Sequence, residues 1–292
     1  MVPRTLKNIG KAISNLDPKD VRATAERLVV IGLTASSGEA LAAMEEYLAP
    51  PTVSRGKRVE ALQSIFRAGD PGAPRSYDVE LTEEGLPYRK GAFVFRFEDP
   101  DRTVREVLKE REALGLSLAR VFPPFRAEVS RQLVRKVSKE NALFALLTAL
   151  PNVAPSILEL PWAVGEFASD TAFITGNQIR LAFLLAAASD RPAGYTEQKR
   201  EIGSIVAGAF GWRTIARELV GKIPFGGGLI PKAAIAYAGT YVVGRSLERL
   251  YRFGYGFTRR ERRSEYEYAY ERGRQVAAAL LKGLRRKAPS AG

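Results

Sequence analysis

The chain has 292 residues, with 45 Lys and Arg against 32 Asp and Glu, a formal charge of +13, and neither His nor Cys. This length is ample for a buried core, in one large domain or two small ones. The missing residue types exclude thiolate metal sites, His-ligated haem, Ser–His or Cys–His nucleophile pairs and disulfides. Composition leaves open a reaction carried by carboxylate, Lys, Tyr or Ser groups, or no reaction at all.

The positive charge is concentrated near the C-terminal end. Residues 257–292 hold 10 basic and 4 acidic residues, nearly half of the total excess. Residues 141–256 hold 11 basic and 8 acidic residues, a low density of charge, and are rich in Ala, Gly, Leu and Ile. The middle segment is therefore predicted to form a core or a membrane contact. The basic start of the chain is not followed by an apolar run of signal-peptide length, so we expect no cleaved export signal.

The N-terminal region, residues 1–140, is predicted to be largely helical. Asp17 and Pro18 are typical of an N-cap and the first position of a helix, and apolar residues recur at helical spacing over 21–33. A second helix is predicted over 38–48, ending before two prolines. Together these segments predict a helical hairpin.

A β-hairpin is predicted near residues 77–97. Apolar and polar side chains alternate at its two ends, on either side of a loop that contains Gly85, Pro87 and Gly91. The phenylalanines that this alternation places on one face, packed on the N-terminal helices, are Phe93, Phe95 and Phe97.

Residues 157–189 are predicted to form one long helix with a polar stripe. Successive members of the stripe are separated by seven, four and seven residues, so they share a face: Glu159, Glu166, Asp170 and Asn177. Two later predicted helices, 197–222 and 233–253, offer arginines as partners, namely Arg213, Arg217, Arg245 and Arg249.

Two interpretations of this stripe stay open. In the first, arginines on neighbouring helices pair with the carboxylates, and the resulting interhelical polar network sets the register of the helices. In the second, Glu166 and Asp170 act as acid and base or hold a metal ion, and the protein is an enzyme.

The segment 223–244 is nearly uncharged, but prolines and three consecutive glycines interrupt it early. About thirteen continuous helical residues follow Pro231, so a simple membrane span is not expected. The glycines do not form a Walker A loop, because Lys232 follows Pro231 and precedes Ala233. Small residues farther along, among them Gly239 and Gly244, predict close helix packing.

Residues 141–257 resemble a known family. The order is an Ala- and Leu-rich helix, a break with prolines, a helix bearing Asp170, Thr171 and Gln178, and two motifs: GWRTIAREL (211–219) and KIPFGGGLIPKAAIAYAGTYVVGRSLERLY (222–251). This pattern is similar to the YcjF-like domain, also catalogued as domain of unknown function 697. The resemblance implies a bacterial, often membrane-associated, helical accessory module whose relatives are appended to GTPase domains, and it carries over no catalytic residues.

The last segment, 258–292, is predicted to be a basic amphipathic helix. Its first residues, TRRE, are a capping box in which Thr258 and Glu261 satisfy helix amides reciprocally. Arginines with aromatic residues near the boundary suit an anionic lipid surface or a partner. The candidate contact residues are Arg259, Arg260, Arg263, Tyr266, Tyr270, Arg274, Leu280 and Leu284.

Two other interpretations of this helix remain. The tyrosines can pack on the helical core while the arginines are simply solvated. Alternatively, the arginines and tyrosines can contact the phosphates and bases of a nucleic acid.

The sequence therefore predicts a mainly α protein: an N-terminal helical region with one small β-hairpin, a bundle of about four long helices over 141–257, and a basic tail helix. The function that we expect is a non-enzymatic, membrane-associated or membrane-proximal scaffold that binds a protein partner through the small-residue helices, with a GTPase as the candidate. We expect no catalytic, cofactor-binding or metal-binding residues, and a location in the cytoplasm or peripheral on the cytoplasmic membrane. An enzyme that uses Glu166 and Asp170, and a nucleic-acid-binding protein that uses the tail, are the alternatives.

Overall fold

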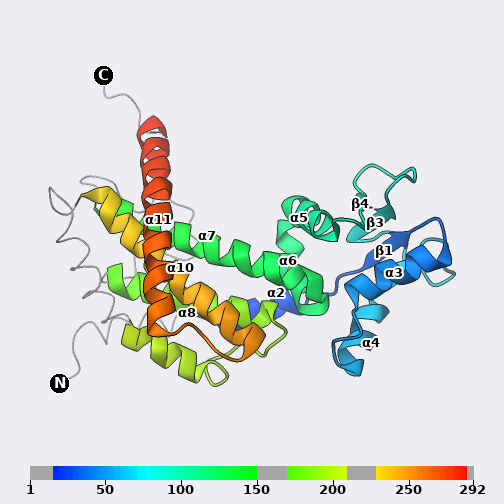
Figure 1. Ribbon diagram of the computed structural model, residues 1–292, viewed down its shortest axis with the longest axis horizontal. Helices are drawn as coiled ribbons and strands as arrows, with labels where there is room; N and C mark the ends of the chain where they lie inside the picture. The colour runs from blue at the N-terminus through cyan, green and yellow to red at the C-terminus, as the bar shows by residue number, and fades with distance from the viewer. Residues whose placement is uncertain (1–15, 150–169, 209–227, 288–292) are drawn as a thin grey trace. The chain divides into compact units, whose positions relative to one another are not determined.

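The computed structural model describes residues 16–149, 170–208 and 228–287. The chain is mainly helical, with one small parallel sheet (Figure 1). It divides into two compact units, which are described separately. The α/β unit comprises Lys19–Arg131 and Ala186–Pro192, and the helical unit comprises Met1–Pro18, Gln132–Leu185 and Ala193–Gly292.

The α/β unit places a four-stranded sheet among short helices. Its elements are α2 (Pro18–Ala25), β1 (Ile31–Thr34), α3 (Gly38–Leu48), α4 (Arg55–Gln63), β2 (Ile65–Arg67), β3 (Val79–Glu83), β4 (Phe93–Phe95), α5 (Pro100–Glu110), η1 (Glu112–Leu114), α6 (Gly115–Val121) and η2 (Pro123–Phe125). The strand order is β2-β1-β3-β4, and every neighbouring pair is parallel. Ile31 is aligned with Ile65 on one side and with Val79 on the other, so β1 is central.

The apolar stretch that was expected to continue the first helix is the central strand. Helix α2 ends at Ala25, and β1 begins at Ile31 after a short connection. Ile31 and Leu33 are fully buried, and the stretch is rich in β-branched residues, which favour strands. The first predicted helix is therefore confirmed at its start, Pro18, but is wrong beyond Ala25, so the two segments do not form a helical hairpin. The helix predicted over 38–48 is confirmed as α3, whose N-terminus is capped by the Ser37 hydroxyl.

The predicted β-hairpin near 77–97 is also wrong, because β3 and β4 are parallel neighbours, with Leu81 aligned to Phe93. The connection contains two glycines with positive φ, Gly85 at 93° and Gly91 at 94°. This left-handed conformation is easily adopted only by glycine. The connection turns twice, so that β4 runs in the same direction as β3. The single turn of a hairpin would have reversed the direction. The alternating pattern predicted both strands but not their relative direction.

The phenylalanine stripe is partly confirmed. Phe93 and Phe95 are buried on β4, whereas Phe97 lies beyond the strand and is exposed. Phe95 contacts the rings of Tyr47 and Phe97 edge-on. Helix α5 covers this region with Val104, Val107 and Leu108, which are all buried. The stripe thus belongs to the core of the α/β unit.

The helical unit is built from long helices. They are α7 (Arg126–Leu147), α8 (Asp170–Ala188), a helical segment at 199–208, α10 (Leu229–Phe253) and α11 (Arg259–Lys287). The boundaries between the units fall inside α2, α7 and α8, and between Pro192 and Ala193. Of the residues predicted as a long helix over 157–189, the structure describes those from Asp170 onward, and they are helical to Ala188.

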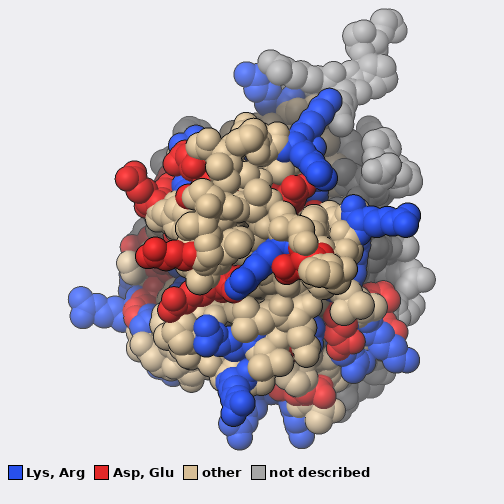
Figure 2. All heavy atoms as spheres, turned by 90° about the vertical axis from the view of Figure 1, so that its right-hand side faces the viewer, with Lys and Arg blue, Asp and Glu red and all other residues tan. Residues whose placement is uncertain are grey.

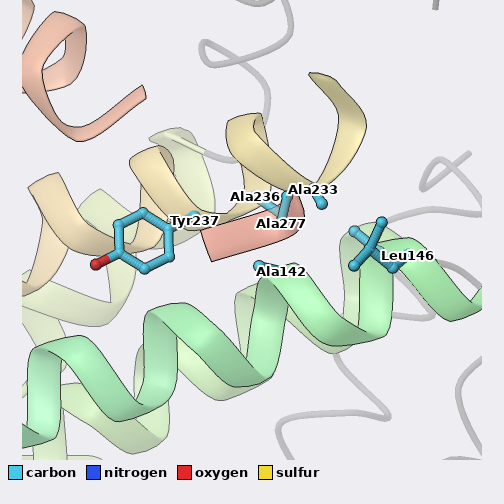
Figure 3. Packing of buried hydrophobic residues seen from close by; sticks show 7 residues of the cluster. Ala142, Leu146, Ala233, Ala236, Tyr237 and Ala277 are labelled. Atoms are coloured by element: carbon cyan, nitrogen blue, oxygen red, sulfur yellow. The ribbon is translucent and has the colours of Figure 1, made fainter. Parts of the chain in front are cut away.

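The small residues of α10 lie against three neighbouring helices. Ala233, Ala236 and Tyr237 of α10 form one buried cluster with Ala142 of α7 and Ala277 of α11 (Figure 3). Alanines at these positions let the helix axes come close, which the small-residue pattern predicted.

Two glycines lie where helices of the helical unit approach one another closely. A Cβ at Gly244 would come within 2.8 Å of the Val134 side chain of α7 and 2.9 Å of Leu181 of α8. A Cβ at Gly273 of α11 would lie 2.9 Å from the backbone oxygen of Ala234 on α10. Because a backbone atom cannot move aside like a side-chain tip, Gly273 is the stricter requirement.

We expect Gly273→Ala to destabilise the protein by about 1–3 kcal/mol, because the added methyl group would force α10 and α11 apart. The measurement is urea unfolding followed by circular dichroism. The matched control is Gly283→Ala on the same helix, where no atom lies within 4 Å of the new Cβ. That control should be neutral or stabilising by up to about 1 kcal/mol, because alanine favours helix more than glycine. Equal stability of the two variants would contradict the close-packing interpretation.

Candidate functional site

A polar network lies inside the helical unit, and it includes one member of the predicted polar stripe. Asn177 of α8 donates from its side-chain amide to the Asn141 oxygen at 2.8 Å. Asn141 of α7 in turn donates to the Thr240 hydroxyl of α10 at 2.7 Å. Gln178 also donates to the Thr240 hydroxyl, at 3.3 Å, and Thr240 donates to the carbonyl of Ala236 at 2.9 Å. All four side chains of the network are buried.

The network reaches the edge of the unit through an ion pair. Arg180 of α8 lies 3.2 Å from the Glu140 carboxylate of α7, and both side chains are mostly buried. Asn177 also donates to Glu140, at 3.2 Å, and accepts from Arg180 at 3.0 Å. Every side chain of the network therefore has a hydrogen-bond or ion-pair partner, which offsets the free-energy cost of burying a polar group. Such a network orders three helices rather than presenting a reactive group.

The other predicted members of the network lie elsewhere. Asp170 forms an ion pair with Lys232 at 2.5 Å, and Arg245 pairs with Glu248 one turn later on its own helix. The residues whose positions lie outside the described residues are Glu159, Glu166, Arg213 and Arg217. The structure thus brings Asn177 together with Asn141 and Glu140, which the sequence analysis did not single out.

We expect Thr240→Val to cost about 1–3 kcal/mol in the free energy of unfolding, because the shape is kept while Asn141 and Gln178 lose a buried acceptor. The measurement is chemical denaturation. Adding Asn141→Leu should cost less than the sum of the two single changes, because the two groups then leave together. Strict additivity of the two variants would show that the contact contributes no coupling energy.

A second candidate site is the turn between α10 and α11, residues 249–263, which we call the arginine–aromatic turn. It contains one acidic residue, Glu261, and six arginines: Arg249, Arg252, Arg259, Arg260, Arg262 and Arg263. Two large rings project from it into solvent, Phe253 with 58% and Tyr255 with 57% of their surface exposed.

The rings and cations of the turn contact each other. The Arg249 guanidinium lies 4.8 Å from the centre of the Tyr255 ring and 5.5 Å from that of Phe257. Arg252 lies 5.0 Å from the centre of the Phe253 ring. Cation–π contacts of this kind hold exposed rings and charges together, at about 0.5–1 kcal/mol each. The turn is therefore an ordered surface that combines apolar and cationic groups.

Local chain chemistry explains why the turn forms there. Helix α10 ends at Phe253 and is capped by Gly254, whose φ of 85° is left-handed and whose N–H donates to the Leu250 carbonyl. The Ser246 hydroxyl accepts from the N–H of Phe257 at 3.0 Å and ties the turn back to α10. The predicted capping box then starts α11 and is confirmed: Thr258 N–H donates to Glu261 at 2.8 Å, and Glu261 N–H donates to Thr258 at 3.3 Å.

Glu261 is the electrostatic anchor of the turn. The backbone N–H of Thr258 and the guanidinium of Arg249 both contact its carboxylate and lower its pKa from 4.5 to about 2. A carboxyl whose pKa is lower in the folded than in the unfolded protein stabilises the fold only when it is ionised. Its contribution is complete above the unfolded pKa and is lost as the pH falls through the folded pKa.

We therefore expect the difference in unfolding free energy between the wild-type protein and Glu261→Gln to be constant above pH 5. It should shrink as the pH falls from about 4.5 towards 2, the pKa values of the unfolded and folded states. Denaturation at a series of pH values is the measurement. Glu267→Gln is a control of the same type, since its one ion pair, with Arg263 at 3.5 Å, is highly exposed. A pH-independent difference for Glu261→Gln would contradict the role assigned to its carboxylate.

The predicted contact residues of the tail helix fall into two groups. Arg259, Arg260, Arg263 and Arg274 are exposed, as the prediction requires for a contact surface. Tyr266 and Tyr270 instead pack with Ala234, Ala238 and Val242 of α10 in a buried cluster. Burial raises the pKa of both tyrosine hydroxyls.

Leu280 and Leu284 are half-buried, and Leu280 packs against the cluster around Tyr237. The tyrosines and Leu280 thus hold α11 on α10, and the arginines remain accessible.

In open parallel sheets, ligands bind at the carboxyl ends of two adjacent strands whose connections leave in opposite directions, here β1 and β3. In this protein, groups of the chain itself lie at that place. The carboxylate of Glu83, at the end of β3, accepts from the N–H of Ser36 at 2.6 Å. The Ser37 hydroxyl accepts from Ala40, and Glu39 stands in the first turn of α3. Carboxylates at this edge disfavour a nucleotide phosphate.

A cluster of charged side chains in the α/β unit is paired internally and connects elements of that unit. Asp190 lies 3.0 Å from Lys57 and farther from Arg120 and Arg126, and Glu60 pairs with both Lys57 and Arg120. Arg126 also donates to two carbonyls at the end of α6. The side of the molecule that Figure 2 shows carries both signs of charge interspersed. The α/β unit does not present a single-sign surface in that view.

In the described ranges, no group of three Asp or Glu side chains could hold a metal ion. Helix α8 is the candidate membrane span among the described residues, by its 19-residue length and its composition, and 78% of its most apolar window is buried within the protein. No family model, curated protein or solved structure matches this chain. The resemblance to the YcjF-like family therefore rests on the quoted motifs alone.

The sequence analysis missed the exposed rings of the turn. The pattern that could have predicted these exposed rings is the alternation of aromatic residues with glycine between two helices, Phe253-Gly254-Tyr255-Gly256-Phe257. Glycines at alternate positions disfavour a helix there. The resulting loop lies next to the polar start of a helix, which offers the rings no apolar surface to pack against.

Proposed function

We propose that this protein is a non-enzymatic, membrane-proximal scaffold that binds an anionic membrane surface through the arginine–aromatic turn. The observation that supports the proposal is the combination of six arginines with two exposed aromatic rings in one ordered turn. Anionic lipid attracts cations near its surface by roughly 1 kcal/mol per Lys or Arg. Exposed aromatic rings are favoured at the boundary between headgroups and acyl chains.

The exposed arginines of α11 extend this surface. Arg274 forms an ion pair with the exposed Glu271 of its own helix at 3.2 Å. Exposed ion pairs of this type are worth little, so they compete weakly with a membrane. The buried tyrosines do not take part, because they hold α11 on α10.

The remaining parts of the proposal concern the partner and the bundle. We propose that α7, α8, α10 and α11 form one bundle and that it belongs to a YcjF-like module. A protein partner, for which a GTPase is the candidate from the resemblance, would bind away from the small residues of α10, and not through them as the sequence suggested. The chain's own helices already cover that face.

The test is binding of the full chain to vesicles of phosphatidylglycerol and phosphatidylcholine, compared with phosphatidylcholine alone. We expect binding only with the anionic lipid, decreasing as salt is added. Reversing Arg259, Arg260 and Arg263 to Glu should weaken binding at least about a hundredfold, since the three cations alone contribute roughly 3 kcal/mol. Acidic residues are favourable at a helix N-terminus, so this variant keeps a stable α11.

The matched control reverses three exposed basic residues of the α/β unit, Arg55, Arg89 and Lys90, and so makes the same change in total charge. It should bind vesicles within a few-fold of the wild-type protein. Equal loss in both variants would show that overall charge, and not this turn, drives the attraction. Binding of single-stranded RNA at low salt without vesicle binding would favour the nucleic-acid alternative.

A further inference from the structure

A cavity of about 410 Å³ opens in the helical unit between the helical segment 199–208 and α10. Its wall is mainly apolar and includes Ile205, Val242, Val243, Leu247 and Leu250. Small-molecule sites in proteins are typically about 300–1,000 Å³, apolar, with a few polar groups. The cavity is at the lower end of this range, which suits one narrow apolar chain. We call it the α10 slot.

The α10 slot adjoins the arginine–aromatic turn. Gly256 and Arg262 of the turn line it, as does Ser246, whose hydroxyl accepts from the N–H of Phe257. The slot and the arginine–aromatic turn therefore share Gly256 and Arg262.

The charged groups that line the slot favour an anion. Among the described residues, they are Arg200, Arg262 and one acid, Glu201. Arg262 uses its Nε to donate to the carbonyl of Phe257 at 3.1 Å, which orients the guanidinium and leaves its terminal nitrogens as further donors. Glu261, the nearest acid in sequence, is engaged by Arg249 and Thr258. Arginine is the side chain best suited to bind phosphate, because its planar fork donates two hydrogen bonds at once.

We propose that the α10 slot binds one acyl chain of an anionic phospholipid, with the lipid phosphate held by Arg200 and Arg262. The inference rests on the proposed membrane function and adds a specific ligand class to it. Each methylene group that enters the slot leaves water, which is the favourable term for a chain in such a cavity. The turn would supply attraction to the surface as a whole, and the slot would select a single lipid.

The experiment uses a monomeric ligand, so that no bilayer is needed. Full-length protein is titrated calorimetrically with a twelve-carbon lysophosphatidylglycerol below its micelle concentration, and in parallel with glycerol phosphate, which lacks the chain. We expect saturable binding of the lysolipid and none of glycerol phosphate. Arg200→Gln with Arg262→Gln should weaken lysolipid binding at least tenfold, because hydrogen bonds to charged groups are lost.

Variants that fill the slot test the position of the acyl chain. Val243→Phe and Ser204→Phe add a ring to the wall on either side, from α10 and from the helical segment 199–208. Each should weaken binding at least tenfold. Ala207→Phe is the matched control, because Ala207 is exposed on the same helical segment and the residues lining the slot do not include it. It should bind within twofold of the wild-type protein, and thermal unfolding checks that all variants are folded.

The outcomes separate this inference from the proposed function. Vesicle binding by the wild-type protein without binding of the monomeric lysolipid would overturn the slot and leave membrane docking intact. Lysolipid binding that the slot variants lose, without vesicle binding, would support the slot and overturn membrane docking. Unchanged lysolipid affinity in both Val243→Phe and Ser204→Phe, or equal affinity for glycerol phosphate, would also overturn the slot.

Discussion

The close contact between α10 and its neighbours is the constraint on which the rest of the helical unit depends. Alanine and glycine line α10 where α7, α8 and α11 approach, and a single Cβ at Gly244 or Gly273 would collide with a neighbour. Helices this close leave no room for water, so polar groups between them must satisfy one another. Thr240, Asn141 and Asn177 do so across three helices. Close packing and the polar network are thus two consequences of one sequence feature.

The same contact determines which groups remain at the surface. Because α11 turns Tyr266 and Tyr270 towards α10, Arg259, Arg260, Arg263 and Arg274 are left facing solvent. The end of α10 before Gly254 leaves Phe253 and Tyr255 beyond the packed part of the helices. Cations and exposed rings therefore meet in the connection between the two helices. That meeting supports membrane docking, and the adjacent α10 slot adds a place for an acyl chain.

The candidate site was predictable in part. Periodicity placed Asn177 correctly on a polar face, but arginines of later helices were named as partners, whereas α7 supplies Asn141 and Glu140. The basic character of the tail and its capping box were evident from residue types and spacing. The exposed rings of the turn were not evident from the sequence, because residue type alone does not show whether an aromatic side chain lies in the core or at the surface.

Residue types and spacing alone were enough to predict the mainly helical class, the start of α11 at its capping box and the small-residue face of α10. These follow from local rules: propensity, capping and spacing act within a few residues. The tertiary structure decided the parallel direction of β3 and β4, the partners of Asn177 and the burial of Tyr266 and Tyr270. Periodicity shows that a side of a helix or strand will be covered, but only the path of the chain decides which element covers it.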